Sequence, residues 1–434
     1  MSLSNIKEKI QKFRASENSR NILWLLSEKF LSITVAIFVG AWVTRFLGPE
    51  NFGLLSYAQS IVYPFSILVA LGLDGVLVRE LVRRPNDKQI LLCTAFIMKL
   101  IASILLFFAM SVVYLSVEDN ELGLLLMIIS FASIFQAFGV VDSYYQSIVK
   151  AKIMVKVRTI VLLVSSILKI ISIQLNLSLE YFAVITVVEA AFLSGLMLYV
   201  YMKGSDGKIK FLFRLDEATS MMKDSSPLLI SAILMAVYMR IDQIIVKNFL
   251  TVKEVGEYVA ATKLSEAMHI IPHVIANTYY PSIIKTKQIG GEIYQLKMLS
   301  LYRMMFLISV VTMALIFVSA DLIISLLYGV QYENSVNVLR IHVWSGVFVG
   351  MFIVSGRWLI AENMGYEALG RNLTALFFVS SLGIMLVPIY GINGAAFAAL
   401  GSYILSGYLY DFFIKKTRPQ FYLKSRAMFL WKRK

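Results

Sequence analysis

The sequence is short of the residues that give soluble proteins their surface and secreted domains their cross-links. It has one cysteine, Cys93, so neither a disulfide nor a thiolate metal site can form within the chain. Charged residues make up 16% of the sequence and hydrophobic residues 58%, whereas a soluble domain carries about 25% charged residues. So few charges could not cover the apolar surface of two or three soluble domains. The chain is therefore predicted to be a membrane protein.

Acidic residues are also scarce, and their shortage gives the chain a net charge of +14. A basic chain can bind nucleic acid when its positive residues gather on one exposed face. Here the basic residues alternate with hydrophobic stretches, so no nucleic-acid partner is expected. There is no Gly-x-x-x-x-Gly-Lys-Ser/Thr run for a nucleotide phosphate and no catalytic constellation. We expect no enzyme activity and no cofactor.

Long apolar runs dominate the rest of the sequence. A helix needs about 20 apolar residues to cross the hydrocarbon core of a bilayer. Windows of this kind occur twelve times, at residues 21–45, 53–79, 90–116, 122–149, 159–178, 180–202, 226–249, 255–284, 300–320, 336–361, 371–390 and 392–414. The predicted fold class is an all-α membrane protein with about twelve transmembrane helices.

The connections between these windows predict the topology. Segments that share a side with the N-terminus hold 31 of the 41 Lys and Arg residues, and the opposite side holds Arg45, Lys247 and Lys253. Basic residues concentrate in cytoplasmic connections, so both termini are expected in the cytoplasm. Residues 1–20 have an apolar helical face and should form an interfacial helix. Residues 415–434 should form a basic cytoplasmic tail.

The two halves of the chain look related. A shift of 203 residues aligns Phe46-Leu47 with Phe249-Leu250 and Gly53 with Gly256. The shift places the connection after the first window on the connection after the seventh. It predicts two six-helix bundles, 21–202 and 226–414, joined by a cytoplasmic linker at 203–225. Parallel repeats in transporters are related by an axis along the membrane normal, and the substrate binds between them.

Several short motifs in fixed order carry a family resemblance over residues 20–414. They are Trp24-Leu25-Leu26-Ser27-Glu28-Lys29, Thr44-Arg45-Phe46-Leu47-Gly48-Pro49-Glu50-Asn51-Phe52-Gly53, Ser56-Tyr57-Ala58, Leu71-Gly72-Leu73-Asp74-Gly75, Val78-Arg79-Glu80-Leu81, Arg240-Ile241-Asp242, Val255-Gly256-Glu257-Tyr258-Val259-Ala260-Ala261, Leu327-Tyr328-Gly329-Val330-Gln331-Tyr332, Tyr390-Gly391-Ile392-Asn393-Gly394-Ala395-Ala396 and Ser402-Tyr403. In these motifs the chain resembles the Wzx-type lipid-linked oligosaccharide flippases of the multidrug/oligosaccharidyl-lipid/polysaccharide (MOP) exporter superfamily.

The resemblance implies a V-shaped pair of bundles around a central cavity, working by alternating access. The implied cargo is an undecaprenyl-pyrophosphate-linked oligosaccharide for O-antigen, capsule or a similar surface polysaccharide, moved across the bacterial cytoplasmic membrane. A polysaccharide polymerase and other assembly proteins would be partners, and an H⁺ or Na⁺ gradient would supply energy. Two alternatives stay open. One is a multidrug or cation exporter of the same superfamily, and the other is a transferase or polymerase of the same pathway, which normally carries a sizeable polar loop.

Charged residues inside the windows are the candidate site. Cations at membrane depth are costly and mark pathways, and a pyrophosphate headgroup needs such cations. The substrate-binding candidates are Lys29, Arg79, Arg240 and Lys263. For Lys29 the alternative is snorkelling to the interface, and for Arg240 it is a salt bridge that only holds the bundle. Arg240 and Asp242 are about 200° apart on a continuous helix, so both cannot point squarely into one cavity.

Acidic and polar residues complete the prediction. The candidates for ion coupling or charge pairing are Glu28, Asp74, Asp242 and Glu266. A polar stripe runs through Lys263, Glu266, His269, His273 and Asn277, and Pro272 within it predicts a kink that serves as a gate. We expect no metal site, because no Cys or paired carboxylate completes the two histidines. A proton relay and a satisfied helix contact both remain open for them. Structural pairing is expected for the other charges within the windows, Lys99, Asp142, Lys169, Glu189, Arg340 and Arg357.

Overall fold

The structure is a computed structural model that describes residues 17–116, 118–204 and 212–429. Most of the expected interfacial helix 1–20, the centre of the linker and the last five residues lie outside the described residues. The helices of the first half are α2 (Glu17–Ala70), α3 (Leu73–Arg83), α4 (Lys88–Ser116), α5 (Asn120–Ala132), α6 (Val140–Ser147), α7 (Ala151–Gln174) and α8 (Leu179–Gly204). Those of the second half are α9 (Leu215–Tyr238), α10 (Ile241–Phe249), α11 (Val252–Ala267), α12 (Ile270–Ile289), α13 (Gly291–Leu327), α14 (Ser335–His342), α15 (Ser345–Ala361), α16 (Gly365–Tyr390), α17 (Ile392–Ile404), α18 (Tyr410–Phe413) and α19 (Arg418–Met428).

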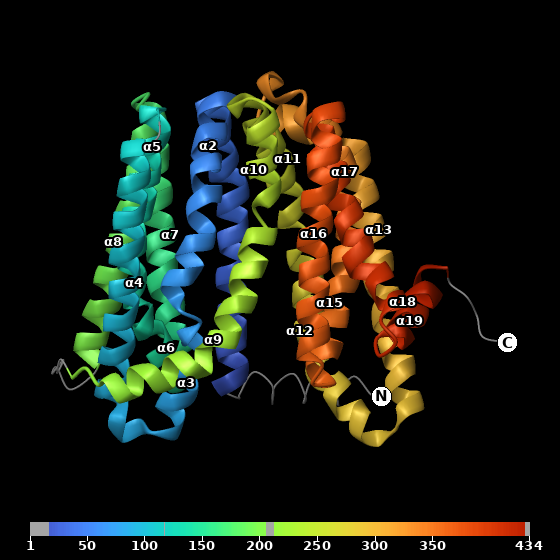
Figure 1. The fold of residues 1–434 in the computed structure, drawn as a ribbon, viewed down its shortest axis with the longest axis horizontal. Coiled ribbons are helices and arrows are strands. Elements are labelled where there is room, and N and C mark those ends of the chain that lie inside the picture. The colour runs from blue at the N-terminus through green and yellow to red at the C-terminus, as the bar shows by residue number, and fades with distance from the viewer. Residues whose placement is uncertain (1–16, 117, 205–211, 430–434) are drawn as a thin grey trace, which may run out of the picture. The chain divides into compact units, whose positions relative to one another are not determined.

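All regular structure in the described part of the chain is helical (Figure 1). Short 3₁₀ turns connect some helices, η1 (Pro85–Asp87), η2 (Ser133–Gly139) and η3 (Val330–Tyr332), and the π-helical turn η4 (Leu405–Leu409) follows α17. Each of the twelve apolar windows falls on helix, which confirms the all-α prediction. Helix α9 begins at Leu215, so the second half of the expected linker is helical.

Eight helical stretches among the described residues are long and apolar enough to cross a membrane. They are Leu31–Arg83, Pro85–Ser116, Asn120–Ser147, Leu179–Gly204, Leu215–Phe249, Gly291–Leu327, Ser335–Ala361 and Gly365–Tyr390. The first covers the window 53–79 and most of the window 21–45, which are separated at Gly48, where the φ of 72° interrupts α2. Glycine adopts a positive φ without steric cost, and Pro49 then suits the first turn of the next helix. The windows 159–178, 255–284 and 392–414 are helical as well.

The chain forms two compact units that do not follow the halves of the sequence. Unit 1 comprises residues 1–43 and 61–233, and unit 2 comprises residues 44–60 and 234–434. The middle of α2, from Thr44 to Ser60, therefore packs with the second half of the chain.

Unit 1 is built on a core from α3, α4, α6, α7, α8 and α9, with Leu73, Leu77, Leu91 and Met154 fully buried. Helix α9 passes close to the break between α2 and α3. A Cβ on Gly72 would lie 2.9 Å from the carbonyl oxygen of Ser225, and Gly72 has a φ of 64°. Only glycine satisfies both the close approach and the backbone conformation there.

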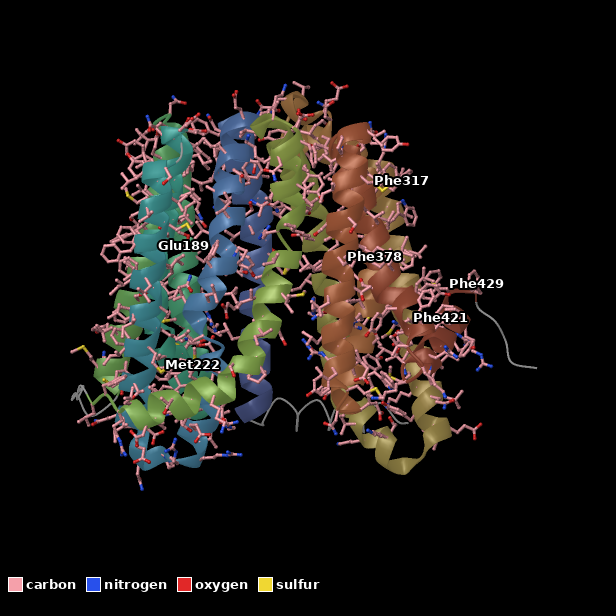
Figure 2. The ribbon with its side chains drawn as sticks, in the orientation of Figure 1. Glu189, Met222, Phe317, Phe378, Phe421 and Phe429 are labelled. Atoms are coloured by element: carbon pink, nitrogen blue, oxygen red, sulfur yellow. The ribbon has the colours of Figure 1, made fainter. Side chains whose placement is uncertain are left out.

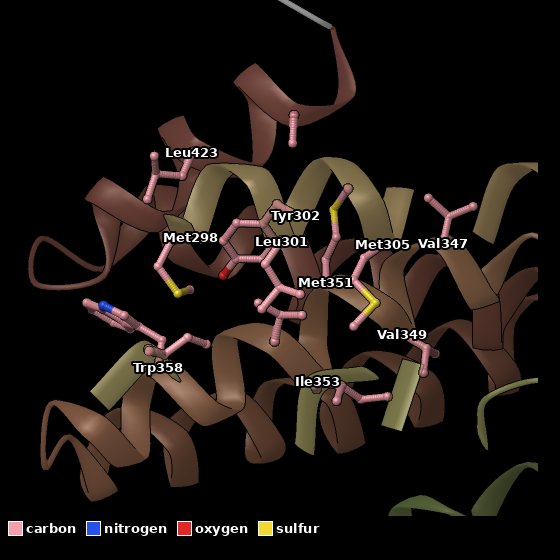
Figure 3. Close-up of a cluster of buried hydrophobic side chains, with 14 of the residues drawn as sticks. Met298, Leu301, Tyr302, Met305, Val347, Val349, Met351, Ile353, Trp358 and Leu423 are labelled. Carbon is pink, nitrogen blue, oxygen red and sulfur yellow. The ribbon is translucent and has the colours of Figure 1, made fainter. Parts of the chain in front are cut away.

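Unit 2 has a core between α12, α13 and α15, to which α19 contributes (Figure 3). Met298, Leu301 and Tyr302 of α13 pack there with Met351 of α15 and Leu423 of α19. Methionine fills irregular gaps between helices well, because its side chain is unbranched and polarizable. This core holds α19 on the bundle.

The aligned glycines of the two halves meet inside unit 2. A Cβ on Gly53 would overlap the carbonyl oxygen of Val252 and lie 2.9 Å from the nitrogen of Gly256. A Cβ on Gly256 would overlap the carbonyl oxygen of Pro49 and lie 3.0 Å from the nitrogen of Gly53. Val252 and Pro49 are themselves aligned by the shift of 203 residues. The contact is thus reciprocal, as a local two-fold axis requires, and it supports the repeat alignment.

Candidate functional site

Three helical spans are broken within unit 2, and ionisable residues lie at the breaks. The chain leaves the helix between α9 and α10 at residues 239–240, between α11 and α12 at 268–269, and between α14 and α15 at 343–344. Arg240, His269 and His342 stand at these breaks. In transporters, interrupted helices inside the membrane typically build substrate and ion sites, because their ends present unpaired backbone groups. The breaks define the candidate site.

Arg240, Asp242 and Glu266 form the charged part of this site. Glu266 lies within electrostatic reach of Arg240, Asp242 and Lys263. The Tyr258 hydroxyl donates a hydrogen bond of 2.7 Å to Oδ2 of Asp242. The predicted 200° separation of Arg240 and Asp242 assumed a continuous helix, but Arg240 has a φ of −133° and precedes the first turn of α10. Both residues therefore act on the same carboxylate.

Lys263 extends from α11 and is exposed. Its ammonium lies 4.6 Å from the ring centroid of Phe52, which comes from the part of α2 in unit 2. A cation over an aromatic face gains about 0.5–2 kcal/mol, depending on how far it is desolvated. The ring of Phe52 therefore helps to position the ammonium of Lys263.

All three histidines of the sequence lie in unit 2. His269 interacts electrostatically with His342 and His273. Within the described residues, Nε2 of His269 and Nδ1 of His342 are buried without a hydrogen-bond partner, and no group of three or more metal-ligating side chains is present. The Tyr403 ring lies 6.4 Å from His269 and 5.7 Å from Tyr238. The site thus combines charged groups with polar rings.

The remaining members of the predicted stripe differ in exposure. His273 and Asn277 are exposed, Glu266 is half-buried, and Pro272 is buried just after the break. The break explains the difference, because a stripe calculated for one straight helix does not continue across it. Pro272 lies next to a real interruption of the span, as its lack of an N–H predicts.

Unit 1 pairs most of its charges. Nε of Arg158 lies 2.9 Å from Oε1 of Glu28, and Nη1 of the same arginine lies 3.3 Å from Oδ2 of Asp142. Lys99 is buried and lies 2.5 Å from Asp74. Glu28 and Asp74 therefore take part in charge pairing. The side chain of Lys29 lies outside the described residues.

Two further interactions belong to unit 1. Arg79 bonds to Asp224 and to Glu80. Lys169 lies 3.3 Å from Glu189, between α7 and α8, where Figure 2 labels the acid. At the end of α3, Arg84 makes hydrogen bonds of 2.7 and 2.8 Å with Glu217, and these bonds raise the pKa of the guanidinium.

Two other predicted pairings lie in unit 2. Arg340 bonds to Asp321, and the guanidinium of Arg357 lies 5.9 Å from the ring centroid of Tyr280. Each of the six charged residues for which we expected a structural partner therefore contacts one among the described residues.

Sequence reasoning missed a network of buried polar side chains between α19 and the helices on which it packs. Lys424 is fully buried and donates to Oδ2 of Asp411 at 2.6 Å, to the carbonyl oxygen of Gly407 at 2.6 Å and to Oγ of Ser355 at 3.1 Å. Burial lowers the pKa of the Lys424 ammonium, and Asp411 opposes that shift. Nη1 of Arg371 donates a second hydrogen bond to Oγ of Ser355, at 2.7 Å. Lys424 belongs to the segment expected to be a basic tail, where nothing in the sequence distinguishes it from its exposed neighbours.

The family described as "Polysaccharide biosynthesis protein" matches residues 42–337, about two thirds of the chain. The chain belongs to the polysaccharide biosynthesis protein family. The matched region includes the breaks at 239–240 and 268–269 and ends before the third break at 343–344. No curated protein sequence matches the chain.

Solved structures with the same fold support this assignment. A lipid II flippase MurJ in an inward closed conformation superposes with a TM-score of 0.72 at 14% identity, covering 94% of this chain and 91% of that one. An inward-facing multidrug resistance MATE transporter of the MOP superfamily gives 0.66 at 14% identity, covering 92% and 94%. A MOP superfamily transporter from Pyrococcus furiosus gives 0.64 at 12% identity, covering 98% and 99%. The family member therefore has the fold of MOP superfamily flippases and transporters, which confirms the resemblance found in its sequence.

Proposed function

We propose that this protein moves undecaprenyl-pyrophosphate-linked oligosaccharide units from the cytoplasmic to the outer leaflet, for O-antigen, capsule or a similar surface polysaccharide. The observation that carries the proposal is the charged centre at the interrupted spans of unit 2, in a chain that belongs to a polysaccharide biosynthesis family. A lipid II flippase with the same fold supports a lipid-linked cargo.

The pyrophosphate–sugar headgroup is the part of the cargo that cannot cross hydrocarbon alone, and its pyrophosphate carries the negative charge. Arg240 and Lys263 supply cations for it, with Lys29 and Arg79 as further contacts along the path. A cation 4 Å from a negative charge contributes about 4 kcal/mol at an effective dielectric near 20. The acids Asp242 and Glu266 compete with the headgroup for these cations, because they lie within reach of Arg240.

Ion coupling follows from the same competition. When H⁺ or Na⁺ binds at Asp242 or Glu266, it neutralises the carboxylate that attracts Arg240. The guanidinium of Arg240 is then available to the pyrophosphate headgroup. We expect Glu266→Gln to remove the dependence of flipping on the ion gradient while transport down a cargo gradient continues. Proteoliposomes with an imposed pH or Na⁺ gradient measure this. Unchanged gradient dependence in both Glu266→Gln and Asp242→Asn would exclude these two acids as the coupling site.

The topology is part of the proposal. The protein spans the bacterial cytoplasmic membrane as two six-helix bundles, with both termini and the 203–225 linker in the cytoplasm, near the polymerase and other assembly proteins. Cysteine labelling tests it, since Cys93 is buried and removable. Position 119 should react from the outside only and position 206 from the inside only. The opposite pattern at either position would reject the arrangement.

The substrate role of Arg240 has a direct test. Arg240→Ala should abolish flipping of a lipid-linked oligosaccharide in proteoliposomes, and Arg240→Lys should restore part of it, because lysine offers a point charge without the bidentate fork. Lys29→Ala should also lower transport. The matched control is Lys169→Gln with Glu189→Gln, which removes an intramembrane ion pair elsewhere. We expect the control to transport normally.

A structural role for Arg240 predicts a different result. If Arg240 serves only to neutralise Asp242, then removing both charges together would restore transport to nearly normal. Deletion of the gene should leave completed lipid-linked units on the cytoplasmic leaflet and abolish the surface polymer. An unchanged polymer in a strain without a related flippase would reject the proposed cargo.

One alternative has an observation in its favour. The centre of unit 2 holds the two acids as well as the cations, and acids suit cationic drugs. A solved structure with this fold is named a multidrug resistance MATE family transporter. Uptake of a fluorescent lipophilic cation into inverted vesicles separates the two functions. The exporter is supported if the dye moves and the lipid-linked oligosaccharide does not.

A further inference from the structure

Helices α18 and α19 and the turn between them expose aromatic and basic side chains, and the guanidinium of Arg418 lies 5.8 Å from the ring centroid of Phe412. We call these side chains together the aromatic–basic surface and define it by Phe412, Phe413, Lys415, Lys416, Arg418, Tyr422 and Phe429. The Phe413 and Phe429 side chains are 71% and 72% exposed. Figure 2 labels Phe429 at the end of α19. Such a large exposed aromatic area is unusual for a face in contact with water and indicates an interaction surface.

The opposite face of α19 is fixed to unit 2. Gln420, Leu423, Lys424 and Ala427 are buried on that face. Gln420 accepts a hydrogen bond of 2.8 Å from the Tyr302 hydroxyl of α13. The three bonds of Lys424 add a buried charge to this contact, and breaking such a pair is strongly destabilising. Helix α19 is therefore a docked element, and its outer face has a defined position on the spans.

That position lies where α13 enters its apolar run. Helix α13 begins with the polar segment 291–297 and continues as a mainly apolar run, in which Arg303 and Asp321 are the charged residues. Leu423 packs against Met298 and Tyr302, just past this transition (Figure 3). The headgroup region of a bilayer must surround α13 at that level, because the apolar run belongs in the hydrocarbon.

We propose that the aromatic–basic surface binds the headgroups of anionic phospholipids in the leaflet that surrounds the start of α13. Aromatic rings are favoured at the headgroup level, and an amphipathic helix with basic and aromatic residues lies in the interface plane. Each basic residue near an anionic leaflet adds about 1 kcal/mol of attraction, or about fivefold in affinity. The positive charge identifies lipid as the occupant in preference to a second copy, whose identical surface would repel it.

Some of this charge is already engaged inside the protein. Lys416 lies 2.8 Å from Glu367, although its side chain stays 71% exposed. The Arg418 Nε donates to the carbonyl oxygen of Phe412 at 3.0 Å. Neither contact involves Lys415. The gain per residue is therefore less than fivefold, and we expect Lys415 and Lys416 together to raise the affinity for anionic lipid about tenfold.

A spin label on the surface tests the proposal with the full chain. A nitroxide is attached at Tyr422→Cys after Cys93→Ala, and the protein is reconstituted in phosphatidylcholine alone or with phosphatidylglycerol. Because α19 is docked at a fixed depth, we expect bound phosphatidylglycerol headgroups to cover the label, so that its accessibility to a water-soluble nickel relaxant falls as phosphatidylglycerol is added. Lys415→Gln with Lys416→Gln should weaken this response about tenfold in the apparent association constant.

The control removes the same charge from another exposed place. Lys152→Gln with Lys156→Gln, in the first turns of α7, should leave the response at position 422 unchanged. A nickel accessibility that does not change with phosphatidylglycerol would overturn the proposal, as would a response that survives the loss of Lys415 and Lys416. Dipolar coupling between labels on two chains would also overturn it, because a second copy would then cover the surface. None of these outcomes depends on the cargo.

Discussion

The reciprocal contact of Gly53 and Gly256 makes an unusual prediction about two substitutions. Gly53→Ala and Gly256→Ala each insert a methyl group against a backbone carbonyl of the facing helix, and against a backbone nitrogen at 2.9 and 3.0 Å. Backbone atoms cannot rotate away as a side chain does. The two helices must therefore separate until the methyl group reaches an ordinary contact of about 3.4 Å or more.

The segment that would have to move is held in place within unit 2. The Tyr332 hydroxyl donates to the carbonyl oxygen of Thr44 at 2.8 Å, and Nε2 of Gln331 donates to that of Arg45 at 2.6 Å. Phe52 packs edge-on against Tyr332. Overpacking a well-fitted contact costs about 1–3 kcal/mol, and these anchors place each alanine near 3 kcal/mol. The same close approach brings Cα–H groups onto carbonyl oxygens, and that contribution is lost as well.

The double variant distinguishes one shared separation of the two helices from two independent losses of stability. A single separation of the helices relieves both clashes, so Gly53→Ala with Gly256→Ala should cost little more than one substitution. The expected coupling energy is about 2–3 kcal/mol, where distant sites would add. Denaturant unfolding of the purified protein in mixed micelles measures the free energies. Gly195→Ala is the control, because nothing lies within 4 Å of its Cβ in α8, and it should stabilise by about 0.5–1 kcal/mol. Additive losses, or single variants as stable as the parent, would refute the reasoning.

Three other predictions concern stability. Lys424→Met should cost about 3–5 kcal/mol of unfolding free energy because it leaves Asp411 buried and unpaired, and Lys424→Met with Asp411→Leu should recover most of the loss in the same denaturation assay. Lys99→Met should cost only about 1 kcal/mol, because its partner Asp74 is 64% exposed and regains water; a loss as large as that of Lys424→Met would contradict this. Gly72→Ala should reduce the melting temperature, whereas the control Gly195→Ala should not, since both the φ of Gly72 and the nearby α9 backbone exclude a Cβ; an unchanged melting temperature would show that α9 moves aside.

The sequence was sufficient for the fold because apolar length and basic connections are strong signals in membrane proteins. The twelve windows all became helix. The site was harder, since side-chain directions were calculated for unbroken helices. Arg240 shows why: its departure from helical φ brings it and Asp242 to the same carboxylate, Glu266. Pro272 signalled a break in the second span, but no proline marks the breaks at Arg240 or His342.

The buried network under α19 lay beyond sequence reasoning for another reason. Lys424 and Lys415 belong to one basic segment, and only the packing of α19 on α13 distinguishes the buried lysine from the exposed one. Likewise, Phe52 gave no sign that its ring would lie under Lys263, 211 positions later in the chain. Long-range contacts of this kind depend on how spans associate, which composition and periodicity do not encode.

The placement of residues 44–60 in unit 2 has a consequence for how the protein is made. This segment leaves the ribosome early, yet its partner helix α11 begins at Val252. At about 5–20 residues per second, roughly 10–40 s pass before Gly256 follows Gly53 out of the ribosome. During that time the small-residue surface around Gly53 faces lipid or the insertion machinery. Unit 2 cannot finish folding before most of the chain has been synthesised. A chain truncated before α11 would therefore leave the helix surface around Gly53 without its partner, where cellular quality control can recognise it.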